Sequence, residues 1–154
     1  MTSRECIDDF LAQKRIAFVG VSRSPGDFSR ALFRELRDRD YEVIPVNPNA
    51  AELEGGKCYG RVQDIDPAPD GVLVMIPKSQ VMGVVNDCID AGVQRLWLHG
   101  INGPNEDHTD MLAACRDHGI RVVSGYCLYM FLSDVNWLHR FHVWIMKAIK
   151  QYPV

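Results

Sequence analysis

The sequence predicts an α/β domain built on a parallel β-sheet, because short apolar runs alternate along it with amphipathic segments. The runs are continuous rather than alternating, which is typical of parallel strands covered by helices on both faces. They occupy residues 16–19, 42–46, 72–76, 96–98 and 120–123. Joined by right-handed crossovers, they make a three-layer, doubly wound sheet of about five strands.

Three segments between these runs have the spacing of amphipathic helices. Apolar residues recur at helical intervals over 28–36 and again over 81–89, where Gly92 lies just past the last of them. The third segment carries its apolar residues at 111–115, and Gly119 is its expected end. Each helix would return the chain to the start of the next parallel strand.

Two further helices are expected outside the sheet-forming region. Residues 3–13 indicate a short helix before the first strand, and 134–150 indicate a longer one. The longer helix adds Trp137, Phe141 and Trp144 to an already apolar face. Exposed apolar surface of this kind marks a contact with a partner, such as a second copy of the chain. The alternative is that the N-terminal segment buries this face, and the sequence leaves both open.

Length and composition are those of a globular protein. The 154 residues fit one domain over 1–154, with a core at about 10–127 and a helical extension over 128–154. The net charge of −3 argues against binding to nucleic acid, which usually requires a basic excess. No apolar run approaches the roughly 20 residues of a membrane helix, and the charged N-terminus is unlike a signal peptide.

The cysteines bear on the compartment. There are five, widely spaced and without a CxxC pair, which argues against a disulfide framework or a zinc site. We therefore expect reduced thiols in a cytoplasmic protein.

The loop after the first predicted strand is the main candidate for ligand binding. In doubly wound sheets, ligands bind beyond the carboxyl ends of the strands, next to the first one. Gly20 allows a phosphate to approach the backbone, the next helix offers N–H groups, and Arg23 and Arg30 add positive charge. The loop is neither G-x-G-x-x-G, because Ser22 is its third residue, nor a P-loop. Its position favours phosphate binding over an ordinary turn.

The end of the second predicted strand bears on which nucleotide would bind. Enzymes that use NAD normally have Asp or Glu there to hold the ribose hydroxyls. This sequence has Asn47, Pro48 and Asn49, and its next carboxylate is Glu52. The residue type at this position counts against NAD.

Three segments of the sequence resemble the stand-alone CoA-binding proteins. They are IAFVGVS at 16–22, YEVIPVNP at 41–48 and GGKCY at 55–59. Those proteins share a fold with the nucleotide-binding domain of the succinyl-CoA ligase alpha subunit. The resemblance covers about residues 10–127 and implies a Rossmann-like domain that holds the ADP part of CoA or acyl-CoA.

The resemblance also implies which residues bind. The turn from Gly20 to Ser24 would face the pyrophosphate, Asn47 and Pro48 would border the adenosine, and Ile76 to Lys78 would close the other side. Lys57 or one of the arginines would meet the 3′-phosphate. The full set of predicted binding residues is Gly20, Val21, Ser22, Arg23, Ser24, Arg30, Asn47, Pro48, Lys57, Ile76, Pro77 and Lys78.

No catalytic residue is assigned. The ligases phosphorylate a histidine on a separate domain, which this chain is too short to hold, so the resemblance implies no ligase activity. His99 at a strand end is the best acid–base candidate, and a histidine that shapes the loop is the favoured alternative. Cys127 could approach the cofactor thiol, although a buried structural cysteine is favoured. His139 and His142 have no third ligand at suitable spacing, so no metal is expected.

Three functions follow from these observations. The first is a CoA-binding module without an assignable reaction, a sensor or carrier, whose partner is a small-molecule nucleotide cofactor. The second is an NAD(P)-dependent oxidoreductase or redox sensor on the same fold. The third is an interaction protein that dimerises through its aromatic C-terminal helix.

Overall fold

A computed structural model describes residues 3–100 and 108–132 and confirms the predicted α/β fold with a five-stranded parallel sheet. The strand order is β2-β1-β5-β6-β7, and all neighbouring strands are parallel. The strands of the sheet are β1 (Arg15–Val19), β2 (Glu42–Val46), β5 (Gly71–Val74), β6 (Arg95–Leu98) and β7 (Arg121–Ser124). The helices are α1 (Arg4–Leu11), α2 (Phe28–Asp38), α3 (Lys78–Asp90) and α4 (Thr109–Asp117).

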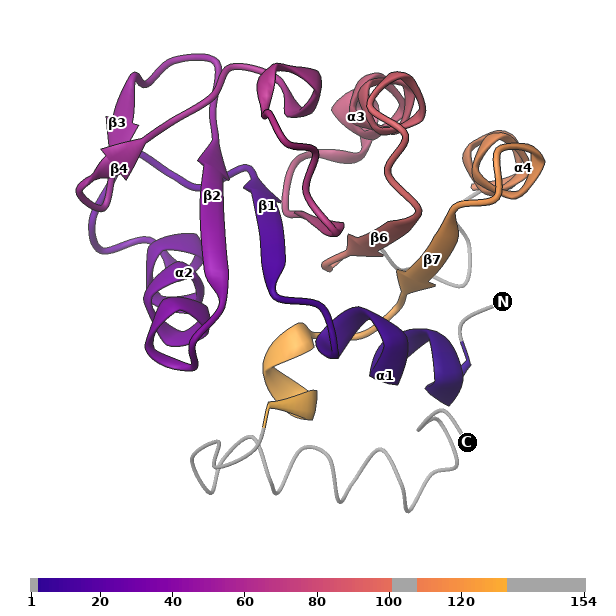
Figure 1. Cartoon of the computed structure of the whole chain (residues 1–154), viewed down its shortest axis with the longest axis horizontal. Helices are drawn as coiled ribbons and strands as arrows, with labels where there is room; N and C mark the ends of the chain where they lie inside the picture. Colours follow the sequence, from indigo (N-terminus) through magenta and orange to yellow (C-terminus); the bar gives the residue numbers. More distant parts are fainter. Residues whose placement is uncertain (1–2, 101–107, 133–154) are drawn as a thin grey trace.

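Helices cover both faces of the sheet, with α3 and α4 on one side and α1 and α2 on the other (Figure 1). Successive residues of β1 divide between the two layers. Ala17 and Val19 pack with the residues of α3 and α4, and Ile16 and Phe18 pack with those of α1 and α2. Because helices bury both faces of the sheet, the side chains on both faces are apolar. This explains why the strands are continuous apolar runs rather than alternating apolar and polar residues.

The chain turns where the sequence predicts helix ends. Gly92 and Gly119 have φ of +71° and +69° just beyond α3 and α4, in the left-handed region that favours glycine. The helix expected over 134–150 lies outside the described residues, and so do His139 and His142. The proposed contact through its aromatic face stays a prediction.

A short hairpin beyond β2 was not predicted. It consists of β3 (Glu52–Leu53) and β4 (Gly56–Lys57), and its two turn residues both have positive φ. The chain that follows runs along β2, because the Tyr59 N–H donates to the Pro45 carbonyl and the Asn47 N–H donates to the Tyr59 carbonyl. Two single-turn 3₁₀ helices, η1 (Val62–Asp64) and η2 (Leu128–Phe131), were not predicted either.

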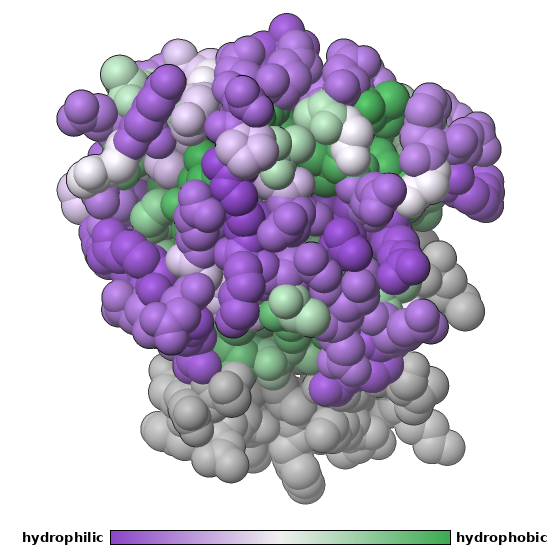
Figure 2. Space-filling view, viewed as in Figure 1, coloured by the Kyte–Doolittle hydropathy of each residue, from purple (hydrophilic) through white to green (hydrophobic). Residues whose placement is uncertain are grey.

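Hydrophilic residues cover most of the face drawn in Figure 2, and hydrophobic residues show mainly in the hollows between them. Within residues 3–100 and 108–132, none of the helices combines the length and the apolar character that crossing a membrane requires. All five cysteines are unpaired thiols, and Cys58, Cys88 and Cys115 are buried.

Leu73 provides a test of this packing. It is fully buried in the central strand β5 between Phe18 of β1 and Trp97 of β6. Leu73→Ala should lower the free energy of unfolding by about 2–5 kcal/mol, because it removes buried methyl groups and leaves a cavity in the core. Leu112→Ala removes the same atoms from a side chain that is 36% exposed, and should cost less than about 1 kcal/mol. Urea unfolding of the two variants measures the difference, and similar costs would contradict the packing described.

Candidate cofactor site at the carboxyl edge of the sheet

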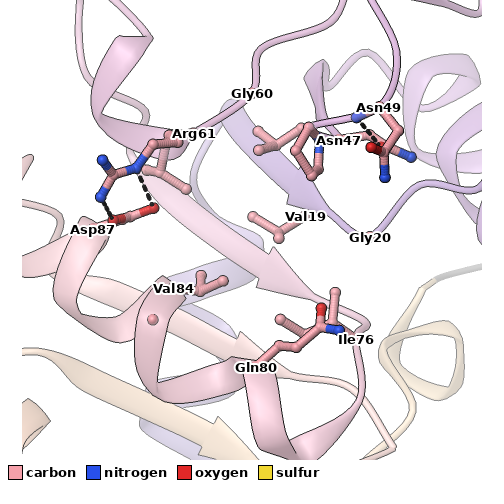
Figure 3. A pocket seen from close by; sticks show the side chains of 14 residues that line it. Val19, Gly20, Asn47, Asn49, Gly60, Arg61, Ile76, Gln80, Val84 and Asp87 are labelled. Atoms are coloured by element: carbon pink, nitrogen blue, oxygen red, sulfur yellow. Dashed lines mark hydrogen bonds and ion pairs between the residues drawn. The ribbon is translucent and has the colours of Figure 1, made fainter.

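A cavity of about 470 Å³ opens at the carboxyl ends of β1 and β2, alongside α3 (Figure 3). Its volume lies within the usual range for small-molecule sites. It adjoins the point between β1 and β5 where the strand order reverses, which is where ligands bind in open α/β sheets. The apolar lining is Val19, Val46, Val62, Ile76 and Val84. The polar lining is Asn47, Asn49, Arg61, Gln80 and Asp87, and the remaining residues are Gly20, Pro48, Gly60 and Gly83.

Gly20 occupies a position that only glycine fits. Its φ is +97°, and a Cβ there would lie 2.7 Å from Cγ2 of Ile76 and closer still to the Met75 carbonyl oxygen. Its N–H donates to the Val46 carbonyl over 3.1 Å. The chain therefore leaves β1 pressed between the ends of its two neighbouring strands, and its backbone forms one side of the cavity.

Asn47 ties the end of β2 to the loop after β1. Its Nδ2 donates to the Val21 carbonyl over 2.9 Å, and its Oδ1 accepts from the Asn49 N–H over 2.8 Å. The side chain thus uses a donor and an acceptor at once, which a carboxylate cannot do. This is the position at which NAD-binding domains have an acid. Here an amide bridges the two loops instead.

The predicted phosphate loop is held by its own side chains. The Ser29 N–H and hydroxyl both donate to Oδ1 of Asp27, over 2.9 and 2.6 Å, and the Ser22 N–H donates to the Ser29 hydroxyl. These bonds to Ser29 lower the pKa of Asp27. The sequence led us to expect an open helix N-terminus here. Instead, a carboxylate caps α2.

Arg30 lies beneath this loop. Its side chain is buried, its Nε is 2.6 Å from Oε1 of Glu54, and its Nη1 donates to the carbonyls of Ser22 and Arg23. Arg34 also pairs with Glu54, and the hydrogen bond from Arg34 is the main cause that holds the pKa of Glu54 below its ordinary value. In this arrangement the guanidinium of Arg30 holds the loop in place through its two carbonyls. Its contact with a phosphate stays a prediction.

Lys57 lines a second cavity, of about 310 Å³, between α2, β2 and the hairpin, together with Arg15 and Arg37. Its Nζ lies 4.7 Å from the centre of the Tyr59 ring.

Four of the twelve predicted binding residues line the first cavity: Gly20, Asn47, Pro48 and Ile76. In the loop after β1, Val21 is fully buried, whereas Arg23 and Ser24 are exposed.

The polar wall that α3 and the segment before η1 supply was not predicted from the sequence. The Arg61 guanidinium pairs with the Asp87 carboxylate, with Nε 3.3 Å from Oδ2, and Gln80 lies on the same side of α3 (Figure 3). Gln80, Val84 and Asp87 are spaced i, i+4 and i+7, so they form one helical stripe. This stripe lies next to the buried stripe of Val81, Val85 and Cys88. Its spacing was the feature of the sequence that could have identified the side of α3 that lines the cavity.

His99 and Cys127 lie together at the ends of β6 and β7. Nε2 of His99 is 3.1 Å from Sγ of Cys127. Burial lowers the pKa of His99 and raises the pKa of the Cys127 thiol. No group of three metal-binding side chains occurs among the residues that the structure describes.

The family of the chain follows from comparison with known proteins. Residues 14–133, which include every residue that lines the first cavity, match the family model of the CoA binding domain. This chain belongs to the CoA binding domain family. A solved structure of a hypothetical protein from Pyrococcus horikoshii has the same fold, with a TM-score of 0.72 and 26% identity over 83% of this CoA binding domain protein and 87% of the other.

Two relatives differ in how much of their own length the match to this CoA binding domain covers. It is 32% identical to the uncharacterized protein YneT of Bacillus subtilis, over 75% of this chain and 82% of that protein. It is 26% identical to an ADP-forming acetate–CoA ligase of Methanocaldococcus jannaschii, over 80% of this chain but only 18% of the ligase. The chain thus spans less than a fifth of that ligase.

Gly20→Ala tests the close approach at the first turn. The added Cβ would meet Met75 and Ile76, and the residue would be held at positive φ, so we expect a loss of at least about 2 kcal/mol in unfolding free energy. The matched control is Gly83→Ala in α3, where a Cβ meets nothing within 4 Å. That variant should be neutral or gain up to about 1 kcal/mol. Thermal unfolding compares them, and a Gly20→Ala protein as stable as wild type would refute the geometry.

The Glu54 ion pairs predict a particular pH dependence. Because the folded-state pKa of Glu54 is lowered from 4.5, its pairs stabilise the fold above that pH and lose this contribution as the pH falls through the lowered value. Glu54→Gln should therefore cost about 1–3 kcal/mol at pH 7 and much less at pH 3. Urea midpoints at the two pH values measure this, with Glu52→Gln, an exposed neighbour, as the control. A cost that is equal at both pH values would exclude the ion-pair explanation.

Proposed function

We propose that this CoA binding domain holds CoA or acyl-CoA by its ADP moiety, with the adenosine in the first cavity. One observation carries the proposal. The cavity opens at the switch point of the sheet, and all of its lining lies inside the segment that matches the family.

The chemistry of the cavity supports adenosine as its occupant. Val19, Val46 and Val84 offer apolar surface of the kind that packs against the faces of a flat base. Asn49 and Gln80 carry amides, which can donate to and accept from the edge of adenine. Asn47 and Pro48 border the same space at the end of β2.

The diphosphate is proposed to lie over Gly20, between the exposed Arg23 and the start of α3. Gly20 brings the backbone to the cavity without a side chain in the way. The N-terminus of α3 at Pro77 and Lys78 carries no side-chain cap, whereas Asp27 caps α2. The positive end of the α3 dipole is therefore the better of the two ends for an anion.

The proposed role is that of a sensor or carrier of CoA, without an assigned reaction. The chain spans less than a fifth of the Methanocaldococcus ligase, so the activity of that protein is not carried over. The five unpaired thiols support a place in the reducing cytoplasm.

Ligand-induced stabilisation tests the proposal. A ligand that binds only the native state must raise the unfolding temperature, and at 100 times its Kd it contributes about 2.7 kcal/mol. CoA should raise the unfolding temperature, dephospho-CoA should raise it less, and NAD should leave it unchanged. Stabilisation by NAD with none by CoA would favour an oxidoreductase or redox sensor and overturn the proposal.

Arg23→Ala tests the phosphate contact. The substitution should weaken CoA binding about tenfold, because it removes a charged partner of the diphosphate. Arg116→Ala is the matched control, since it removes another exposed arginine, from α4 at the far edge of the sheet. Isothermal titration calorimetry compares the two dissociation constants. Equal affinities would remove Arg23 from the site.

A further inference from the structure

His99 and Cys127 form a thiol–imidazole pair that the proposed CoA site does not use. The 3.1 Å between Nε2 and Sγ is a hydrogen-bond contact. Hydrogen bonds fix the backbone at or next to both residues. The His99 N–H donates to the Val74 carbonyl, and the Trp97 indole N–H donates to the carbonyl of Tyr126, directly before Cys127. Both residues are only partly buried, so the pair is not enclosed in the core.

The 3.1 Å contact places the sulfur and the nitrogen where a proton can pass between them, although burial keeps both groups neutral until the sulfur begins to form a bond. Burial raises the pKa of the Cys127 thiol, partly offset by the amides of Tyr129 and Met130, and burial lowers the pKa of His99. Both groups are therefore neutral at pH 7, so S–H donates and Nε2 accepts. When the sulfur attacks an electrophile, the imidazole can take its proton, as in other thiol–histidine pairs.

The pair faces the same edge of the sheet as the cofactor cavity. His99 follows the carboxyl end of β6, which is separated from β1 by β5 alone, so it stands about 10 Å from the Gly20 strand at ordinary strand spacing. The pantetheine arm of CoA is longer than this and ends in a thiol. Phe28, at the start of α2, lies beside the pair: its ring is 44% exposed and its centre is 5.8 Å from that of His99. It offers an apolar surface along which the arm can run.

We propose that Cys127 is a thiol-exchange site that forms a mixed disulfide with CoA, with His99 as its proton acceptor. This inference rests on the proposed binding of the ADP moiety, which brings the far end of the cofactor to the pair. The co-reactant is the symmetrical disulfide of CoA. Cys127 Sγ attacks one of its sulfurs and passes its proton to Nε2 of His99. The disulfide bond of the oxidised CoA breaks, the Cys127–CoA bond forms, and the leaving CoA thiolate takes the proton from the imidazolium.

The experiment treats the full chain with oxidised CoA and follows adducts by intact mass and peptide mapping. We expect one CoA adduct, on Cys127, and none on Cys6, the other cysteine that is not fully buried. Glutathione disulfide should react at least tenfold more slowly, because it lacks the nucleotide that docks first. His99→Gln should slow the CoA reaction at least tenfold, because the proton acceptor is lost. Cys6→Ala is the matched control and should react like wild type.

A parallel thermal shift with reduced CoA under excess reductant separates this inference from the proposed function. If reduced CoA stabilises the protein but oxidised CoA gives no adduct on Cys127, the exchange site is wrong and the binding proposal stands. If both disulfides modify Cys127 at equal rates, docking does not direct the reaction and the inference is overturned. If His99→Gln reacts as fast as wild type, His99 is not the proton acceptor. The wild-type adduct map decides the site even if a variant fails to fold.

Discussion

The close approach of Gly20 to the end of β5 is the constraint on which the carboxyl edge of the sheet depends. The backbone lies so near Met75 and Ile76 that no side chain fits, and the N–H of Gly20 is bonded to the end of β2. Asn47 then fixes the loop that follows by binding the Val21 carbonyl. Three strand ends are thereby joined, and the cavity is the space that they and α3 leave open.

Positive charge is concentrated near these strand ends, although the chain as a whole is acidic. Three arginines of α2 meet the single carboxylate of Glu54, and the most buried of them, Arg30, also holds the carbonyls of the first loop. Asp27 occupies the N-terminus of α2, so α3 offers the helix end without a carboxylate cap. The net charge of −3 therefore says little about the site. The positions of individual charges decide what it can attract.

The five strands and the ends of α3 and α4 could be predicted, because burial on both faces and left-handed glycines leave local marks in a sequence. The hairpin at Glu52–Lys57 was missed, although two turn residues with positive φ join its strands, because each strand is only two residues long. Gly20 was expected at the site from its place after the first strand, and Asn47 and Ile76 were expected from the resemblance to the CoA-binding proteins. Arg61 and Asp87 were not, because their pairing joins segments 26 residues apart. The Asp27 cap and the His99–Cys127 contact likewise depend on how side chains turn in three dimensions.

In the proposed complex, the nucleotide end of CoA lies in the first cavity and its thiol end points along the sheet edge toward β6. A crystal structure of the CoA complex tests this most directly. We expect adenine against Val46 and Val84, the diphosphate over Gly20, and the sulfur near Cys127. A complex with the nucleotide in the second cavity beside Lys57, and the first cavity filled by water alone, would contradict it.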